Sequence, residues 1–242
     1  MRMLGFAKRN TKEILRDPLT LFFGLGFPIV LLVLLSAIQA NIPVALFEIP
    51  HLAPGIAVFG LSFMTLFSAL LIARDRTSSL LARLYTTPMR PSDFIFGYTL
   101  PMLVIALLQS IVCYLAAIPF GLAVTPHFFL AIISTLPSAL LYIALGLLSG
   151  SLLTDKQVGG ICGALLTNLS AWLSGIWFDL ELVGGAFRDV AYALPFVHAV
   201  ELSRAALSGN FGEILPHILW VLGYTAAILV AAVLVFLRQM KR

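Results

Sequence analysis

The chain has 242 residues, of which 60% are apolar and 11% are charged. Soluble domains are about 45–50% apolar and about 25% charged, and a soluble globule of this length could not bury so much apolar surface. The composition therefore excludes a soluble domain, a disordered chain and a disulfide-stapled scaffold. It predicts an all-α integral membrane protein.

Uncharged stretches between charged clusters predict six transmembrane helices. A span needs about 20 residues, and prolines and glycines divide the longest uncharged stretch into two spans. The expected spans are residues 19–38, 52–73, 95–118, 128–153, 158–178 and 217–237. We treat 1–242 as a single transmembrane domain, which divides into an interfacial helix (1–17), spans one to five (18–178), an external segment (179–217) and the sixth span with its tail (218–242).

The basic residues predict the orientation of the chain. Of the fifteen lysine and arginine residues, all but Arg188 and Arg204 lie on one side of the expected spans. Because positive residues stay cytoplasmic, we expect both termini to be cytoplasmic in a multi-pass protein of the cell membrane. The positive net charge is typical of contact with anionic lipid. No basic–aromatic motif indicates nucleic acid.

Residues 2–16 are predicted to form an amphipathic helix. At 100° per residue, the apolar side chains fall on one side of the helix and the basic ones on the opposite arc. The basic residues are Arg2, Lys8, Arg9, Lys12 and Arg16. Such a helix lies at a membrane interface, although anchoring by positive charge alone is the simpler alternative. Asp17 followed by Pro18 suits the N-cap and first turn of span one.

The loop after span two predicts a short helix of its own. Thr77 and Ser78 offer N-caps, and Pro88 ends the helix. Leu80, Leu81 and Leu84 share one face at helical spacing. An apolar ridge of this kind lies on a membrane or docks into the groove of a partner. The pattern does not favour either alternative.

The external segment predicts short helices before the last span. Pro195 is placed to begin one of them and Gly209 to end it. Trp172, Trp177 and Trp220 fall near the outer ends of spans five and six, as an interfacial aromatic belt does. We expect these helices to lie on the outer leaflet or to dip into it.

The spans hold few groups that perform chemistry. They carry no Asp, Glu, Lys or Arg, and the chain has no phosphate-binding loop. We therefore expect no enzyme activity and no catalytic, cofactor or metal residue in this chain. Cys113 and Cys162 are interpreted as small apolar residues.

Small and mildly polar residues inside the spans have two interpretations. Gly146 and Gly150 form one GxxxG pair and Gly159 and Gly163 another, which suits helix packing within the chain or against a second copy. Gln109 and Asn168 either line a route for an amphipathic substrate or form hydrogen bonds between helices.

Three stretches resemble the membrane (permease) subunit of type 2 ABC exporters. The opening RNTKEILRDPLTLFFGLGFPIVL (Arg9–Leu31) is similar to the start of the drug-efflux branch of that family. The loop ARDRTSSLLARLYTTPMRPSDFIFGY (Ala73–Tyr98) resembles its arginine–acid pair, Leu-x-Arg-Leu core and Thr-Pro. LPFVHAVELSRAALSGNF (Leu194–Phe211) resembles the segment before the last span. Together with the order of the predicted parts, the resemblance covers nearly the whole chain.

The resemblance implies an ATP-driven exporter. The loop helix near 77–87 would be the coupling helix that contacts a separate ATPase subunit, which binds the ATP and Mg²⁺. The implied coupling residues are Arg74, Asp75, Thr77, Ser78, Leu80, Leu81, Arg83, Leu84 and Thr87. The implied cytoplasmic gate in the N-terminal helix consists of Arg9, Lys12, Arg16 and Asp17. Candidate pathway or packing positions are Gln109, Asn168, Gly159 and Gly163.

A second membrane subunit, identical or different, would complete the pathway for an amphiphilic substrate such as a drug, peptide or lipid-like molecule. The alternatives are export of a polysaccharide or glycolipid, and a membrane immunity or assembly factor that transports nothing. Many relatives have Gly-Thr where this chain has Ser79 and Leu80, and Glu at the positions of Asp75 and Ala82. These differences affect which residues would contact the ATPase subunit, and not the resemblance to the family.

Overall fold

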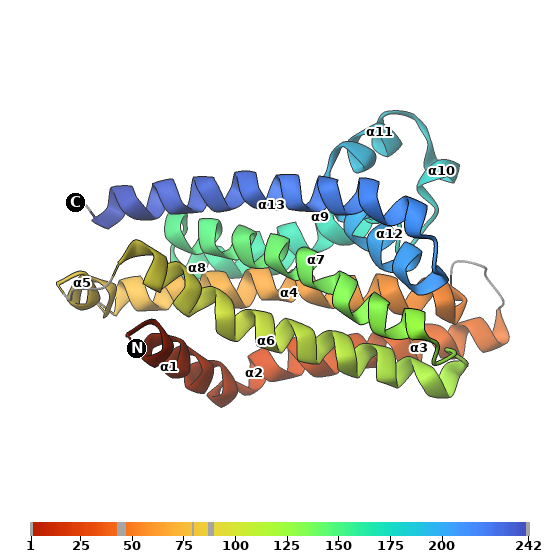
Figure 1. Ribbon diagram of the computed structural model, residues 1–242, viewed down its shortest axis with the longest axis horizontal. Helices are drawn as coiled ribbons and strands as arrows, with labels where there is room; N and C mark the ends of the chain where they lie inside the picture. The colour runs from red at the N-terminus through yellow and green to blue at the C-terminus, as the bar shows by residue number, and fades with distance from the viewer. Residues whose placement is uncertain (1, 43–46, 79, 87–89, 241–242) are drawn as a thin grey trace.

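The computed structural model describes residues 2–42, 47–78, 80–86 and 90–240. Every regular element of this described part is helical, and the long helices run side by side along the molecule (Figure 1). Five segments are long and apolar enough to cross a membrane: Pro18–Asn41, Ile49–Thr77, Ser92–Phe120, Pro126–Leu152 and Phe211–Arg238. The expected all-helical membrane architecture is confirmed over these segments.

The first of these segments begins where the sequence predicts. Asp17 caps it by accepting hydrogen bonds from the backbone N–H groups of Leu19 (3.1 Å) and Thr20 (3.4 Å), with Pro18 in the first turn. The helix then continues through three consecutive elements: α2 (Pro18–Leu21), the π-helix η1 (Phe22–Gly26) and α3 (Phe27–Asn41).

Helix α4 (Ile49–Thr77) is the central helix of the bundle, and most of its residues are buried. It packs against α3, α6 (Pro91–Ala117), α7 (Pro126–Leu152) and α12 (Pro195–Ser208). The contact with α7 is the most extensive one. A Cβ added at Gly146 would lie 2.7 Å from the carbonyl oxygen of Thr65, and one at Gly150 would lie 2.7 Å from that of Ala69. The first GxxxG pair thus packs within the chain.

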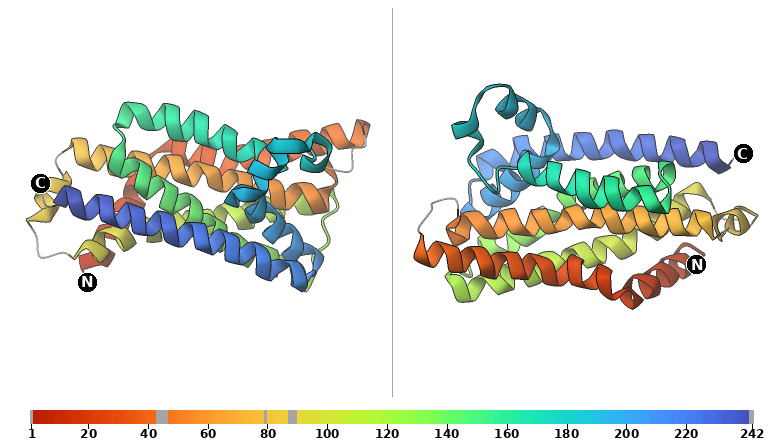
Figure 2. Two further views of the ribbon diagram at one scale, coloured as in Figure 1. Left: turned by 90° about the horizontal axis from the view of Figure 1, so that it is seen from above. Right: turned by 180° about the vertical axis from the view of Figure 1, so that it is seen from behind.

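The segment predicted as span five, 158–178, is helical over a shorter length. It comprises α8 (Asp155–Val158), the π-helix η4 (Gly159–Leu166) and α9 (Thr167–Trp172), which lie alongside α4 (Figure 2). The helix ends before 178 because the chain turns at Gly175, whose φ of 68° is a backbone conformation that favours glycine. By length and composition this segment is not among the five candidate spans.

The remaining short helices connect these long segments. The 3₁₀-helix η3 (Ile118–Phe120) follows α6, and α5 (Leu80–Tyr85) follows α4. Helices α10 (Leu180–Val183), α11 (Gly185–Ala193) and α12 precede the last long helix, α13 (Phe211–Met240). Helix α1 (Arg2–Arg16), α5 and the end of α13 lie at one end of the bundle, and α10 to α12 lie toward the other (Figure 1).

Helix α12 has the predicted bounds but is more buried than a helix lying on a membrane surface. Pro195 is in its first turn, and Gly209 ends it with a φ of 77°. Ala199, Val200 and Leu202 are fully buried against the bundle. The segment 179–217, which the sequence predicts to be external, therefore contributes one helix to the core, while α10 and α11 project from it.

Two histidines join α12 to α13. The Nδ1 atoms of His198 and His217 are 2.9 Å apart, and Nε2 of His198 lies 3.0 Å from the carbonyl oxygen of Tyr192. The His198 ring also stacks on Trp220, with 4.9 Å between the ring centroids. Burial lowers the pKa of His198 below its usual value, and the Tyr192 carbonyl partly opposes this effect.

The lowered pKa of His198 predicts a loss of stability in acid. As the pH falls below about 6.5, the unfolded chain binds a proton at His198 more readily than the folded chain, so the free energy of unfolding decreases. We expect the thermal unfolding temperature in detergent to drop by a few degrees between pH 7 and pH 5. A His198→Gln variant should show a smaller drop, and an equal drop would contradict the prediction.

Candidate functional site

Helix α1 is docked against the bundle through one face. Phe6, Asn10 and Ile14 are buried along this face, and the Phe6 ring packs edge-on against Tyr98 of α6 with 4.9 Å between centroids. Asn10 donates a hydrogen bond from Nδ2 to the carbonyl oxygen of Gly97 (3.0 Å). Part of the apolar side predicted for a membrane interface therefore contacts the protein itself, while Leu4 and Leu15 stay exposed.

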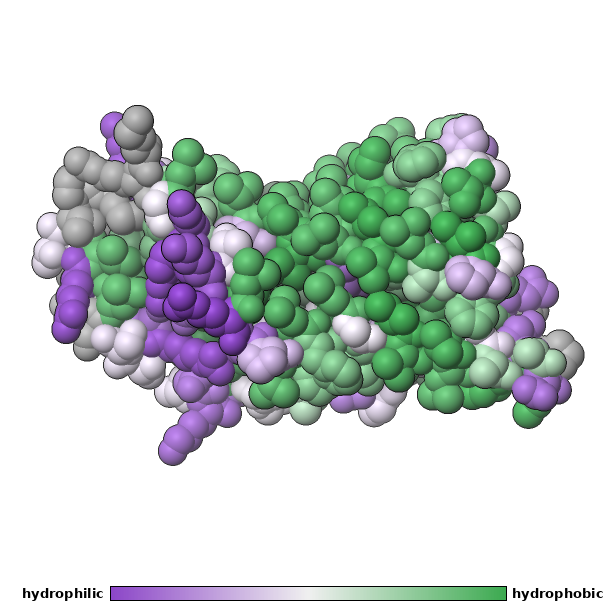
Figure 3. Space-filling model, turned by 90° about the horizontal axis from the view of Figure 1, so that it is seen from below, coloured by the Kyte–Doolittle hydropathy of each residue, from purple (hydrophilic) through white to green (hydrophobic). Residues whose placement is uncertain are grey.

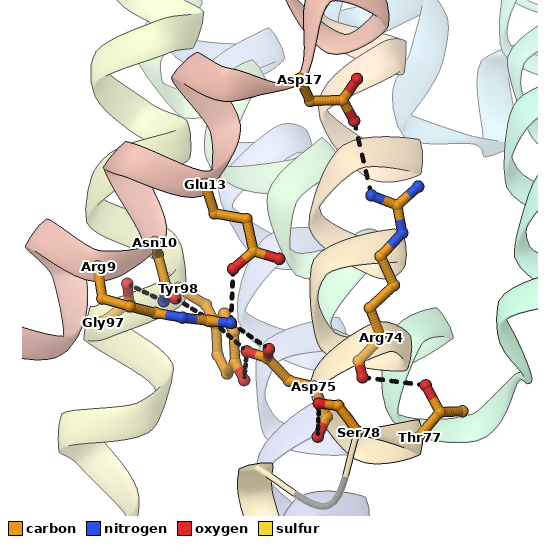
Figure 4. A network of polar contacts seen from close by, with 10 residues as sticks. All are labelled: Arg9, Asn10, Glu13, Asp17, Arg74, Asp75, Thr77, Ser78, Gly97 and Tyr98. Carbon is orange, nitrogen blue, oxygen red and sulfur yellow. Dashed lines mark hydrogen bonds and ion pairs between the residues drawn. The ribbon is translucent and has the colours of Figure 1, made fainter.

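Asp75 lies where α1, α4 and α6 meet. Its carboxylate is buried and accepts two hydrogen bonds from the Arg9 guanidinium, at 2.6 and 2.7 Å (Figure 4). The Tyr98 hydroxyl donates a third, at 2.8 Å. A buried carboxylate is tolerated when it is paired and fully hydrogen-bonded. We refer to Arg9, Asp75 and Tyr98 as the junction.

Glu13 extends the junction on α1. It forms an ion pair with Arg9 one helical turn earlier (Figure 4). Burial raises the pKa of Glu13 above its usual value, and the charge of Arg9 partly opposes this shift. Arg9 therefore contacts two carboxylates, one buried and one partly exposed.

The arginines on either side of Asp75 bind other parts of the chain. Arg74 lies 3.6 Å from Asp17, at the start of the first span, and 3.8 Å from Asp155, at the start of α8. Arg76 donates to the carbonyl oxygens of Gly150 (2.9 Å) and Ser151 (2.6 Å). These carbonyls lie at the C-terminal end of α7, where the helix itself supplies no donors. These two arginines thus bond the end of α4 to the first span, α8 and α7, in addition to the bonds of Asp75 with α1 and α6.

The loop helix differs from the prediction for 77–87. Helix α4 continues through Thr77, and the Thr77 and Ser78 hydroxyls donate to carbonyls of α4, to Arg74 (3.0 Å) and Asp75 (3.3 Å), instead of capping the next helix. Helix α5 is only six residues long. The predicted residue Thr87 lies outside the described residues, as does Ser79.

The apolar ridge of α5 turns toward its own subunit. Leu81 is 2% exposed and belongs to the hydrophobic core, and Leu84 packs against the same core. Leu80 is partly buried, whereas Arg83 is exposed. Of the predicted coupling residues on α5, Arg83 is therefore the one that faces outward.

The four candidate pathway or packing residues are not equivalent. Gln109 is buried and donates from Nε2 to the carbonyl oxygen of Ala57 on α4 (3.1 Å), which makes it a helix-packing residue. Asn168 is exposed and bonds within its own helix. Gly163 packs against Leu66 of α4, while a Cβ on Gly159 would meet nothing within 4 Å.

The sequence matches the profile of the ABC-2 type transporter family over residues 3–208, which is most of the chain. The chain belongs to the ABC-2 type transporter family. It is a multi-pass transmembrane subunit of an ABC transporter, a membrane component that is not itself catalytic, and membership of the family implies ATPase partner subunits. No curated protein matches the sequence.

Three residues that bond the helices of this ABC-2 subunit at or near the junction were not predicted from the sequence: Asn10, Arg76 and Tyr98. Tyr98 was inside the stretch that resembles the family, but nothing in the pattern pairs it with Asp75. Asn10 and Arg76 bind backbone carbonyls, and a backbone partner leaves no signature in a sequence.

Proposed function

We propose that this ABC-2 subunit is part of an ATP-driven exporter that moves a drug-like, peptide or lipid-like amphiphile outward, with both termini cytoplasmic. The resemblance of Arg9–Leu31 to the drug-efflux branch supports this substrate class. The cytoplasmic end would be the end that carries α1 and α5. The segment Asp155–Trp172 would supply a sixth crossing, and the helical run of 18 residues spans roughly 27 Å at 1.5 Å per residue.

The observation that carries the coupling part of the proposal is the position of the junction at the base of α5. Asp75 lies two residues before the end of α4. Its carboxylate accepts hydrogen bonds from Arg9 of α1 and from Tyr98 of α6, so it bonds α4 to both helices. A force applied to α5 by an ATPase subunit would reach all three helices through these bonds. ATP binding would then bias two arrangements of the helices, which is the physical requirement for coupling.

A second membrane subunit, identical or different, would face the exposed side of the segment Asp155–Trp172. Gly159 and Gly160 on this segment have open space where a Cβ would lie. Leu165 and Asn168 are exposed on it as well. Small residues on an exposed helix face allow a neighbouring helix to approach closely, and Asn168 would offer a polar contact to the substrate between the subunits.

The proposal predicts that Arg83→Glu abolishes coupling without unfolding the subunit. Arg83 is exposed on α5, and a hot-spot residue in the centre of an interface contributes about 2 kcal/mol or more, so reversal of its charge should lower ATPase retention by at least about thirtyfold. The measurements are co-purification of an ATPase from the native host and ATP-dependent export by reconstituted vesicles. Arg238→Glu, which reverses an exposed charge at the same end of the bundle, is the control.

Normal retention and export in Arg83→Glu would contradict the assignment of α5. If no ATPase accompanies the unmodified subunit in mild detergents, the exporter function itself is wrong, and the immunity or assembly alternative replaces it.

A further inference from the structure

Three basic residues of α1 have no ion-pair partner among the described residues. Lys8, Lys12 and Arg16 follow one another at intervals of four residues, so they form a stripe along one side of the helix. All three are exposed, and none forms an ion pair with any residue in the described part of the chain. Seen from the side on which α1 lies, hydrophilic side chains form a band near one end of a largely apolar surface (Figure 3).

The stripe lines a cleft of about 800 Å³ between α1 and the end of α4. Arg9 and Arg74 complete the basic lining, and Glu13 and Asp17 are the acidic residues in it. Both carboxylates are already engaged: Glu13 pairs with Arg9, and Asp17 caps the first span. The three stripe residues therefore give the cleft an uncompensated positive charge, which attracts an anion.

The surroundings of the cleft indicate what kind of anion fits. Leu15 is 57% exposed, and Leu19 and Phe22, farther along the first span, are 66% and 53% exposed. An apolar surface thus leads from the basic cleft along the membrane-spanning part of the chain. A soluble phosphate would use only the cleft, whereas a phospholipid would use both, with its headgroup on the basic residues and its acyl chains on the apolar side chains.

We propose that this cleft binds the phosphate-bearing headgroup of an anionic phospholipid, with its acyl chains along Leu19 and Phe22. Lys8, Lys12 and Arg16 provide the charge, and Arg74 closes the cleft on the α4 side. A bound lipid holds α1 in its docked position beside the junction. The inference goes beyond the proposed export function and does not depend on the substrate or on the direction of transport.

The test uses the full chain in nanodiscs of phosphatidylcholine with increasing amounts of phosphatidylglycerol. Native mass spectrometry after release from the nanodisc measures the retained lipid. The unmodified chain should retain phosphatidylglycerol at a saturable site. The variant Lys8→Gln/Lys12→Gln should retain it roughly thirtyfold more weakly. Lys156→Gln/Arg238→Gln removes the same charge from exposed positions outside the cleft and should bind like the unmodified chain.

Two outcomes would overturn the proposal. Equal loss in both double variants would mean that the basic end attracts lipid without a specific cleft. Displacement of the lipid by an excess of inorganic phosphate would mean that the cleft takes a soluble anion. If the two double variants have the same unfolding temperature, the comparison is between folded proteins. If the Lys8→Gln/Lys12→Gln variant unfolds at a different temperature, the single variant Lys12→Gln replaces it.

Discussion

Replacing Asp75 by asparagine should release α1 from the bundle. The carboxylate that accepts from both Arg9 and Tyr98 is lost, and the partly buried Arg9 guanidinium keeps Glu13 as its remaining ion-pair partner. Removing one partner of a buried pair costs about 3–5 kcal/mol. We expect the lower end of this range because the Arg9 side chain is 38% exposed and gains water. The unfolding temperature should fall, and protease cleavage within α1 should become faster.

The control for this prediction is Asp155→Asn. This carboxylate is about half exposed and lies 3.8 Å from Arg74, and such surface pairs contribute about 0–1 kcal/mol. A double-mutant cycle with Arg9→Gln then isolates the pair, because the second substitution should cost little once the first has been made. Equal effects of Asp75→Asn and Asp155→Asn would show that the junction does not hold α1.

Gly150→Leu should prevent α7 from packing on α4. Even a Cβ at this position would lie 2.7 Å from the carbonyl oxygen of Ala69 and 2.8 Å from its Cα, and both are backbone atoms that cannot rotate away. Overpacking a core costs about 1–3 kcal/mol when side chains adjust, so a collision with backbone should cost more. We expect little folded, monodisperse protein by size-exclusion chromatography after extraction in mild detergent.

Gly223→Leu is the matched control for this substitution. Gly223 is also a glycine of a long membrane helix, but a Cβ there meets nothing within 4 Å. The variant should fold normally, since leucine has a higher helix propensity than glycine. If both variants fold, the close approach of α4 and α7 is not a requirement of the fold.

Local rules account for much of the fold that could be predicted. Composition and charge spacing indicate helices across a membrane, and the Asp17 cap and the Pro195 and Gly209 bounds follow from the chemistry of single residues. The end of the segment predicted as 158–178 could not be predicted in the same way. Its apolar character continues beyond Trp172, and the turn at Gly175 depends on how the chain meets α12 and α4.

The contacts of the candidate site could not be predicted from the sequence. The sequence places Asp75 beside Arg74 and Arg76, yet its partner is Arg9, which lies 66 residues earlier in the chain. The choice among three arginines depends on which helix faces which, and this is a property of packing. Leu81 shows the same limit, because a ridge of leucines has the same pattern whether it contacts a partner, a membrane or its own subunit.

The bonds around α4 have a mechanical consequence. Arg76 ties the end of α4 to the end of α7, the Thr65 hydroxyl donates to the carbonyl of Tyr142 (2.7 Å), and the glycines of α7 bring the two backbones into contact. Two helices joined at several levels along their length resist sliding and twisting past each other, so we expect them to move as one rigid body. The first and last spans are far less buried within the chain. We therefore expect any rearrangement of the subunit during transport to change the tilt of these outer helices more than the packing of α4 on α7.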